Sequence, residues 1–190
     1  MICFKIRGIS LRLSFGFFTV LALLCTLEQG AYLWYSVCAI VIHEGLHLLM
    51  MLLLRQRLHS VTFYGCGIRL RPAHVLCSYG KELLVLLAGP FGNLLVWGML
   101  LYFEGDRMLA GANLALGLMN LLPCRHLDGG AALRCIFGLV QHEPWRTERL
   151  ITGMACAVLL LMIVGAWLLE VGNFTYYALC IYLLFAEIFR

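Results

Sequence analysis

Long apolar stretches are the feature that most restricts the fold of this chain. Six can be delimited, of which the first and fourth are short for a transmembrane helix of about 20 residues; they cover residues about 13–27, 31–54, 82–103, 108–123, 150–169 and 174–189. Only 13% of the residues are charged, against about 25% in soluble domains. The sequence predicts an all-α polytopic membrane protein of about six transmembrane helices, forming a single membrane-embedded domain over residues 1–190 in contact with the lipid bilayer.

The segment between the second and third stretches, about 55–81, differs from the rest. It carries five Lys and Arg residues, and its part 61–70 consists of strand-forming residues interrupted by Gly65 and Gly67. This pattern is typical of two short paired strands. We expect a small β-hairpin there, at the membrane surface between the second and third transmembrane helices.

The distribution of charge predicts the orientation. With six spans, both termini share one side of the membrane with the loops 55–81 and 124–149, and that side holds thirteen of the fourteen Lys and Arg residues. Only Arg107 lies opposite. Cationic residues flank spans on the cytoplasmic face, so we expect both termini in the cytoplasm. Topology thus accounts for the net charge of +4, and no nucleic-acid partner is expected.

A metal-binding motif lies inside the second apolar stretch, at His43-Glu44-Gly45-Leu46-His47. Residues four apart lie on one face of a helix, so the two imidazoles can bind one zinc ion, and the intervening glutamate can act as general base. Ionisable side chains within an apolar span are costly and indicate function by default. The alternatives are a chance match or a polar contact between helices.

A catalytic zinc ion requires a third protein ligand, with a fourth position left open. Asp128 is the best candidate, because it follows the fourth apolar stretch on the side of the membrane toward which His47 lies. Pro123, Gly129 and Gly130 interrupt the helix around it, and irregular backbone at membrane depth is tolerated where it lines a cavity. The alternative is a solvated loop carboxylate.

These motifs, taken in order, resemble those of the site-2 protease family of intramembrane zinc metalloproteases. The H-E-x-x-H motif is followed by Gly89-Pro90-Phe91-Gly92-Asn93 and then by Asn120-Leu121-Leu122-Pro123 leading to Leu127-Asp128-Gly129-Gly130, so the resemblance covers about 31–135, the expected catalytic core. The compact size is most similar to the bacterial branch that contains the stage IV sporulation protease. The resemblance implies one zinc ion held by His43, His47 and Asp128, with Glu44 as catalytic base and Asn120 in the cleft. It also implies a location in the bacterial plasma membrane.

The sequence leaves the roles of Cys124, His126 and Asn93 open. The family often has small apolar residues or proline where this chain has Cys124, Arg125 and His126. Cys124 or His126 is therefore a rival metal ligand. Asn93 is either a residue that hydrogen-bonds between helices or a contact to the substrate backbone.

The resemblance implies hydrolysis of peptide bonds in membrane-tethered protein substrates, in regulated proteolysis of a transcription-factor precursor or of its membrane-bound regulator. We therefore expect a membrane-tethered protein substrate and a membrane regulatory protein as partners. The rival functions are an inactive scaffold of the same fold, which would not need Glu44, and a metal transporter. A transporter is expected to carry acidic or histidine residues in several spans, whereas here they concentrate in the second to fourth.

Overall fold

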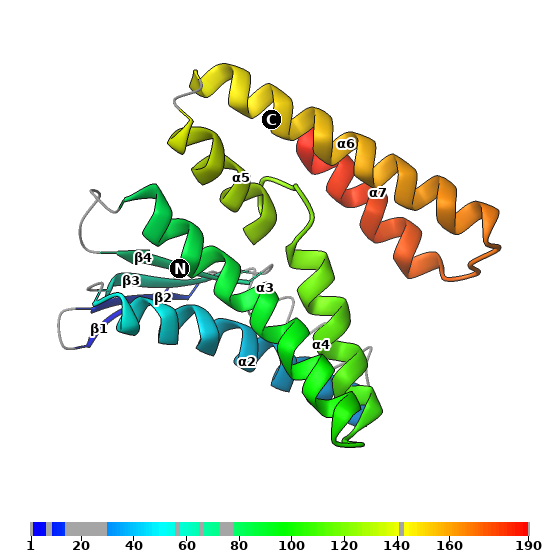
Figure 1. Cartoon of the computed structure of the whole chain (residues 1–190), viewed down its shortest axis with the longest axis horizontal. Helices are drawn as coiled ribbons and strands as arrows, with labels where there is room; N and C mark the ends of the chain where they lie inside the picture. Colours follow the sequence, from blue (N-terminus) through cyan, green and yellow to red (C-terminus); the bar gives the residue numbers. More distant parts are fainter. Residues whose placement is uncertain are drawn as a thin grey trace.

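The computed structural model describes residues 2–6, 9–13, 30–55, 58–64, 67–72, 78–140 and 143–189. Strands and helices alternate in the N-terminal part of the chain, and helices alone follow (Figure 1). In chain order the elements are β1 (Ile2–Ile6), β2 (Ile9–Leu13), α2 (Ala31–Leu53), β3 (Leu58–Tyr64), β4 (Gly67–Pro72), α3 (Tyr79–Tyr102), α4 (Arg107–Asn120), α5 (Asp128–Leu139), α6 (Pro144–Leu168) and α7 (Phe174–Ile188).

Three of the described helices are long and apolar enough to cross a membrane: α2 over Tyr32–Leu53, α3, and α6 over Trp145–Leu168. Helix α4 has 14 residues and α7 has 15, and at 1.5 Å per residue a helix of that length spans about 21–23 Å, less than the hydrocarbon core. The membrane character of the chain is thus supported, but the prediction of about six transmembrane helices is not. The first predicted span, about 13–27, lies almost wholly outside the described residues.

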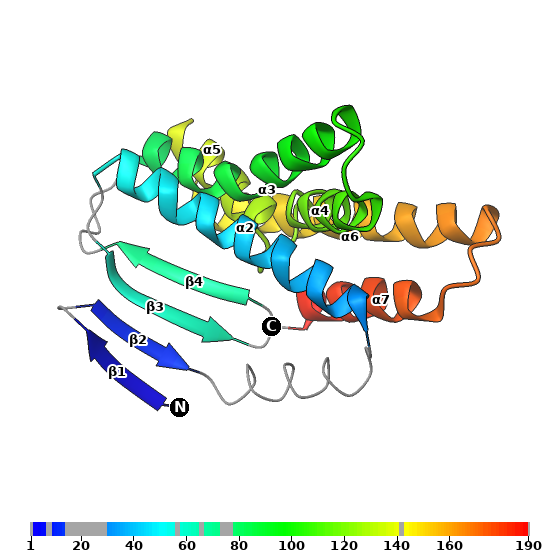
Figure 2. The same ribbon diagram turned by 90° about the horizontal axis from the view of Figure 1, so that it is seen from below.

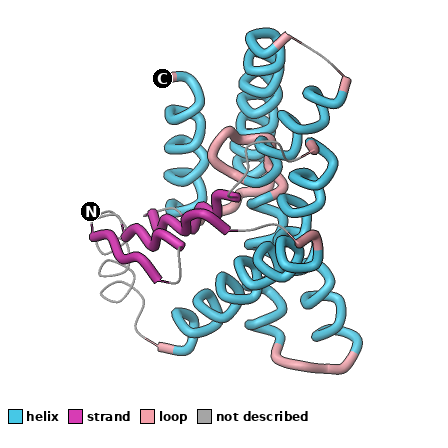
Figure 3. The backbone as a smooth tube through the Cα atoms, turned by 90° about the vertical axis from the view of Figure 1, so that its left-hand side faces the viewer, coloured by secondary structure: helices cyan, strands magenta, loops and turns pink. Residues whose placement is uncertain are grey.

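Four strands form one sheet in the order β1-β2-β3-β4. Strands β3 and β4 pair antiparallel, with Thr62 opposite Arg69, in the range where the sequence predicted a lone hairpin. The structure instead extends this pair, because β2 runs parallel to β3 and antiparallel to β1. Figures 2 and 3 show the sheet as a layer beside the helices, next to α2.

Helices α3 and α4 approach each other closely where α4 carries a glycine. A Cβ atom at Gly117 would lie 3.0 Å from the backbone oxygen of Pro90, so a larger residue would push the two helices apart. Near the turn between them, the Asp106 carboxylate caps α4 by accepting from the N–H groups of Met108 and Leu109 and also accepts from the Tyr35 hydroxyl. The backbone N–H of Leu109, followed by the Tyr35 hydroxyl, lowers the pKa of Asp106.

Helices α6 and α7 lie side by side at the other end of the molecule (Figure 1). Their contact with the rest of the fold includes α5 and a small core cluster around Cys124. This cluster consists of buried Cys124, Ala155, Leu159 and Leu183. The loop 121–127, which leads to α5, is thus packed against the C-terminal helix pair.

Candidate metal centre

The two motif histidines project from α2 into the protein interior. They are 5% and 6% exposed, and their ring centroids lie 4.7 Å apart in an edge-to-face arrangement. The i, i+4 spacing on the helix places both rings on one face, as the sequence predicted. Glu44, between them, is partly exposed and lies outside the group of three residues that can share a metal ion.

Asp128, the first residue of α5, meets this histidine pair although it lies more than eighty positions later in the chain. Its Oδ2 atom is 3.0 Å from Nε2 of His43 and 3.1 Å from Nε2 of His47, and the two Nε2 atoms are 3.1 Å apart. Three ligand atoms, one from each side chain, lie within 4.8 Å of one another. Asp128 therefore lies close enough to both histidines to share a metal ion with them, which is the position that the sequence predicted.

Each imidazole is oriented by a hydrogen bond from its other nitrogen. Nδ1 of His43 is 3.0 Å from Oδ1 of Asn93, and Nδ1 of His47 is 2.7 Å from the backbone oxygen of Val85. A carbonyl oxygen only accepts, so in the neutral ring Nδ1 carries the proton and Nε2 keeps its lone pair. Both lone pairs are then available to one cation, the arrangement that metal-binding histidines typically have.

Asn93 is itself held in place by a residue that the sequence did not single out. Its amide nitrogen donates to the backbone oxygen of Ala39 at 3.3 Å and to Oδ1 of Asn113 at 3.1 Å, while the Asn113 amide donates to the backbone oxygen of Leu109. Both asparagines are 0% exposed. The contacts of Asn93 are thus those of a residue that bonds between helices, one of the two expected roles.

Glycines provide the room for these side chains. A Cβ atom at Gly89 would lie 2.3 Å from Nε2 of His47, so the G-P-x-x-N element leaves space directly at the histidines. A Cβ atom at Gly129 or Gly130 would lie within 2.5 Å of the backbone of loop 121–127. The glycines after Asp128 therefore let α5 begin directly against that loop.

The other sequence candidates make different contacts. Cys124 belongs to the core cluster with α6 and α7, where burial raises the pKa of its thiol to about 11, and His126 is exposed. Neither belongs to the group of His43, His47 and Asp128. Asn120, partly buried at the end of α4, donates to the backbone oxygen of Leu116 in its own helix.

The residues present fit a zinc ion. Two imidazole nitrogens and one carboxylate oxygen are a ligand set that zinc prefers, and three protein ligands leave a fourth position for water or substrate. The hydrogen bonds to the two Nδ1 atoms and the space at Gly89 add to this fit.

Comparison with known proteins finds a matching family model and a similar solved structure. The model of the family described as Peptidase family M50 matches residues 106–164, a range that includes Asp128. The structure is similar to that of the Site-2 Protease from Methanocaldococcus jannaschii, with a TM-score of 0.65 and 20% sequence identity over 98% of this chain and 93% of that chain. At this identity the structural likeness concerns the fold. None of the curated protein sequences compared with the chain matches it. Together the family model and the fold confirm the resemblance to the site-2 proteases, without reaching the sporulation branch.

Proposed function

We propose that this relative of the site-2 proteases is an integral-membrane zinc metalloprotease that hydrolyses peptide bonds of membrane-tethered proteins. The observation that carries the proposal is the convergence of three ligand atoms from α2 and α5 within 4.8 Å, with Glu44 directly beside His43 on α2. A structural cluster of paired polar groups would not require that neighbouring carboxylate. The match of the M50 family model supports the same reaction.

One zinc ion is held by Nε2 of His43, Nε2 of His47 and Oδ2 of Asp128 in this proposal. When bound, zinc supplies Lewis-acid chemistry, which polarises a scissile carbonyl and makes water more acidic. Asn93 and the backbone oxygen of Val85 fix the two imidazole rings, so the ligands are oriented before the ion binds.

Glu44 acts as the general base. It takes a proton from the attacking water and then delivers it to the leaving amine. It follows His43 directly in α2, and the proposal places its carboxylate next to the site where water is activated. Asp128 is engaged with both imidazoles, so the base role falls to Glu44.

Substitution of Glu44 by glutamine tests this function. We expect Glu44→Gln to lower cleavage of a membrane-anchored test substrate by at least about a hundredfold, the contribution of a general base, while zinc remains bound. Chelation should abolish wild-type cleavage, and added zinc should restore it. Appreciable proteolysis by Glu44→Gln would disprove the assignment of the base. A protein that binds zinc without cleaving any substrate would favour a scaffold, and zinc flux into vesicles would favour a transporter.

A helical substrate must unwind before attack, because its carbonyls are bonded within the helix. Strand β4 ends the sheet order, and an extended segment can add to such an edge. We propose that β4 binds the unwound substrate segment and that Asn120 lies in the cleft. Shortening β4 by deletion of 67–70 should then impair cleavage of a helical substrate more than that of a short extended peptide; equal impairment would refute the role of β4.

Regulated proteolysis of a transcription-factor precursor, under a membrane regulatory protein and within the bacterial plasma membrane, remains part of this proposal. So does the orientation with both termini in the cytoplasm. Thiol labelling of single-cysteine variants in intact cells tests the orientation. Ser78→Cys should resist a membrane-impermeant reagent until permeabilisation, whereas Val171→Cys, in the exposed turn after α6, should label at once. The opposite pattern would invert the topology.

A further inference from the structure

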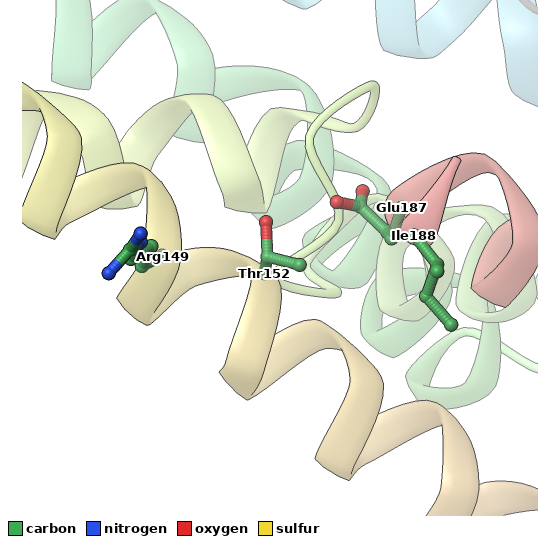
Figure 4. Close-up of a pocket in the computed structure, with 4 residues that line it drawn as sticks. All are labelled: Arg149, Thr152, Glu187 and Ile188. Atoms are coloured by element: carbon green, nitrogen blue, oxygen red, sulfur yellow. The ribbon is translucent and has the colours of Figure 1, made fainter. Parts of the chain in front are cut away.

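A second polar site lies at one end of the α6–α7 pair, away from the histidines. It is a cavity of about 360 Å³ lined by Arg149, Thr152, Glu187 and Ile188. Figure 4 shows Thr152 between Arg149 and the Glu187 carboxylate. The metal centre uses none of these residues.

Glu187 is the unusual member of this site. It is 3% exposed, and its Oε1 atom accepts a hydrogen bond from the backbone N–H of Arg125 at 2.5 Å. Its Oε2 atom is buried without a hydrogen-bond partner among the described residues. A buried carboxylate oxygen without a partner is costly, so the cavity that Glu187 lines is suited to a ligand that donates a hydrogen bond and carries positive charge.

The cavity also offers a positive group and an apolar wall. Arg149 supplies a guanidinium group for an anion, and Ile188 supplies apolar surface. A ligand that matches all three features carries an ammonium group, an anionic group nearby and an apolar tail. These are the parts of phosphatidylethanolamine.

The level of the cavity along α6 fits a lipid headgroup. The first turns of α6 carry Trp145, Arg146, Glu148 and Arg149, whereas the helix is predominantly apolar from Leu150 onward, with Leu150 and Met154 exposed. Arg146 and Arg149 both lie over the Trp145 ring at 5.2 Å. Tryptophan and arginine are enriched where a span meets the headgroup layer. Lipid ammonium groups are abundant at that level.

We propose that this cavity binds the headgroup of phosphatidylethanolamine. The Oε2 atom of Glu187 turns from its buried position toward the cavity and accepts from the ammonium group. The phosphate lies toward Arg149, and an acyl chain follows Ile188 along the apolar part of α6. The proposal is independent of the protease function. Because Glu187 also bonds the backbone of Arg125, three residues before Asp128, a bound headgroup would contact the same carboxylate that holds the loop leading to α5.

Phosphatidylcholine provides the matched probe, since it has the same phosphate and charge but no N–H donor. The two lipids, with identical acyl chains, are titrated onto the purified full chain in detergent and counted by native mass spectrometry. We expect the wild type to bind phosphatidylethanolamine about tenfold more tightly, which corresponds to about 1.4 kcal/mol. Equal binding of the two lipids would overturn the proposal.

Glu187→Gln is the sharpest variant, because its amide oxygen can still accept from the Arg125 N–H while its NH₂ group cannot accept from an ammonium group. The ratio of the two affinities should fall to about one. The control Glu170→Gln, at an exposed carboxylate, should keep the wild-type ratio. Arg149→Gln should weaken both lipids equally. A ratio unchanged in Glu187→Gln would overturn the proposal.

A second variant and a soluble competitor complete the test of the lipid site. Thr152→Val keeps the Glu187 carboxylate but removes a hydroxyl that lines the cavity and can accept a hydrogen bond from the ammonium group. The ratio should fall, so the proposal stays testable if Glu187→Gln does not fold; an unchanged ratio would overturn it. Soluble phosphoethanolamine at the same concentrations should not displace the lipid. Displacement would assign the site to free amines and refute a lipid site.

Discussion

Helices α2, α3 and α4 bury more polar side chains than the C-terminal helices α6 and α7 do. The first three bury Asn93, Asn113 and both motif histidines, and these side chains bond to one another or to backbone oxygens of the same helices. The C-terminal pair packs mainly apolar residues such as Ala155, Leu159 and Leu183, and its charged contacts gather at one end. In the first region the buried polar groups orient the two histidines, whereas in the second the polar groups lie at one end of the helix pair.

The largest effect is expected where the two regions meet, at Asp128. Asp128→Ala removes the carboxylate that bridges both histidines, so zinc content and proteolysis should both be lost. Metal analysis of the purified variant measures this. The control His126→Ala alters a neighbouring exposed residue and should retain zinc. If His126→Ala loses zinc and Asp128→Ala retains it, His126 rather than Asp128 is the third ligand.

Gly89→Ala should produce the next largest effect, within the first region. The added Cβ atom would meet Nε2 of His47 at 2.3 Å and Cε1 of His43 at 2.8 Å, so both rings must move. Displacement of about 1 Å can lower a catalytic rate by about a hundredfold, and kcat should fall by that order. Gly98→Ala in the same helix meets no atom within 4 Å and serves as the control. Equal activity of the two variants would show that the histidines do not need this space.

Asn113→Leu should have a smaller effect, because Asn113 acts on the metal site only through Asn93. Loss of the acceptor for Asn93 loosens the orientation of His43, and zinc affinity should fall by about tenfold, the lower end for partners of metal ligands. Asn113→Asp should recover most of the affinity, since a protonated carboxyl group offers the same donor and acceptor. A competition titration with a chelator measures both. If Asn113→Leu loses stability but keeps wild-type zinc affinity, the asparagine is structural only.

Glu148→Gln should have the smallest effect on stability and none on zinc affinity, so it tests whether the C-terminal helices act independently of the metal site. The Glu148 carboxylate is bonded to Arg125 at 2.6 Å, and both side chains are about 30% exposed. Such partly solvated pairs contribute about 0.5 kcal/mol to the free energy of unfolding, which denaturation measures. Zinc affinity should be unchanged. A fall in zinc affinity comparable to that of Asn113→Leu would mean that α6 also controls the ligands.

The sequence predicted the clustering of His43, His47 and Asp128 better than the architecture around it. The spacing of His43 and His47 depends only on helix periodicity, and Asp128 could be chosen from the break in the chain around it. Asn113 lies in no motif, and its role depends on a contact between α3 and α4 that spacing does not reveal.

The sequence of the N-terminal strands β1 and β2 contains an alternating pattern that mean hydropathy does not reveal. Ile2, Phe4 and Ile6 alternate with Cys3 and Lys5, and Ile9, Leu11 and Leu13 alternate with Ser10 and Arg12. This period of two is typical of strands, but it lies directly before the apolar stretch 13–27, for which a span was predicted. Six spans are not supported by the described part of the chain, because α4 and α7 have 14 and 15 residues, fewer than a spanning helix needs.

The separation of the ligands along the chain has a consequence for biosynthesis. His43 and Asp128 lie 85 positions apart, so the ribosome completes α2, the strands β3 and β4, α3 and α4 before the carboxylate is made. In the proposed membrane protease, α2 therefore enters the bilayer with the polar side chains of His43, Glu44 and His47 before Asp128 is available to complete a metal site. In the proposed metalloprotease, metal loading is thus a late event of maturation, and it begins only after α5 has docked against the preceding helices.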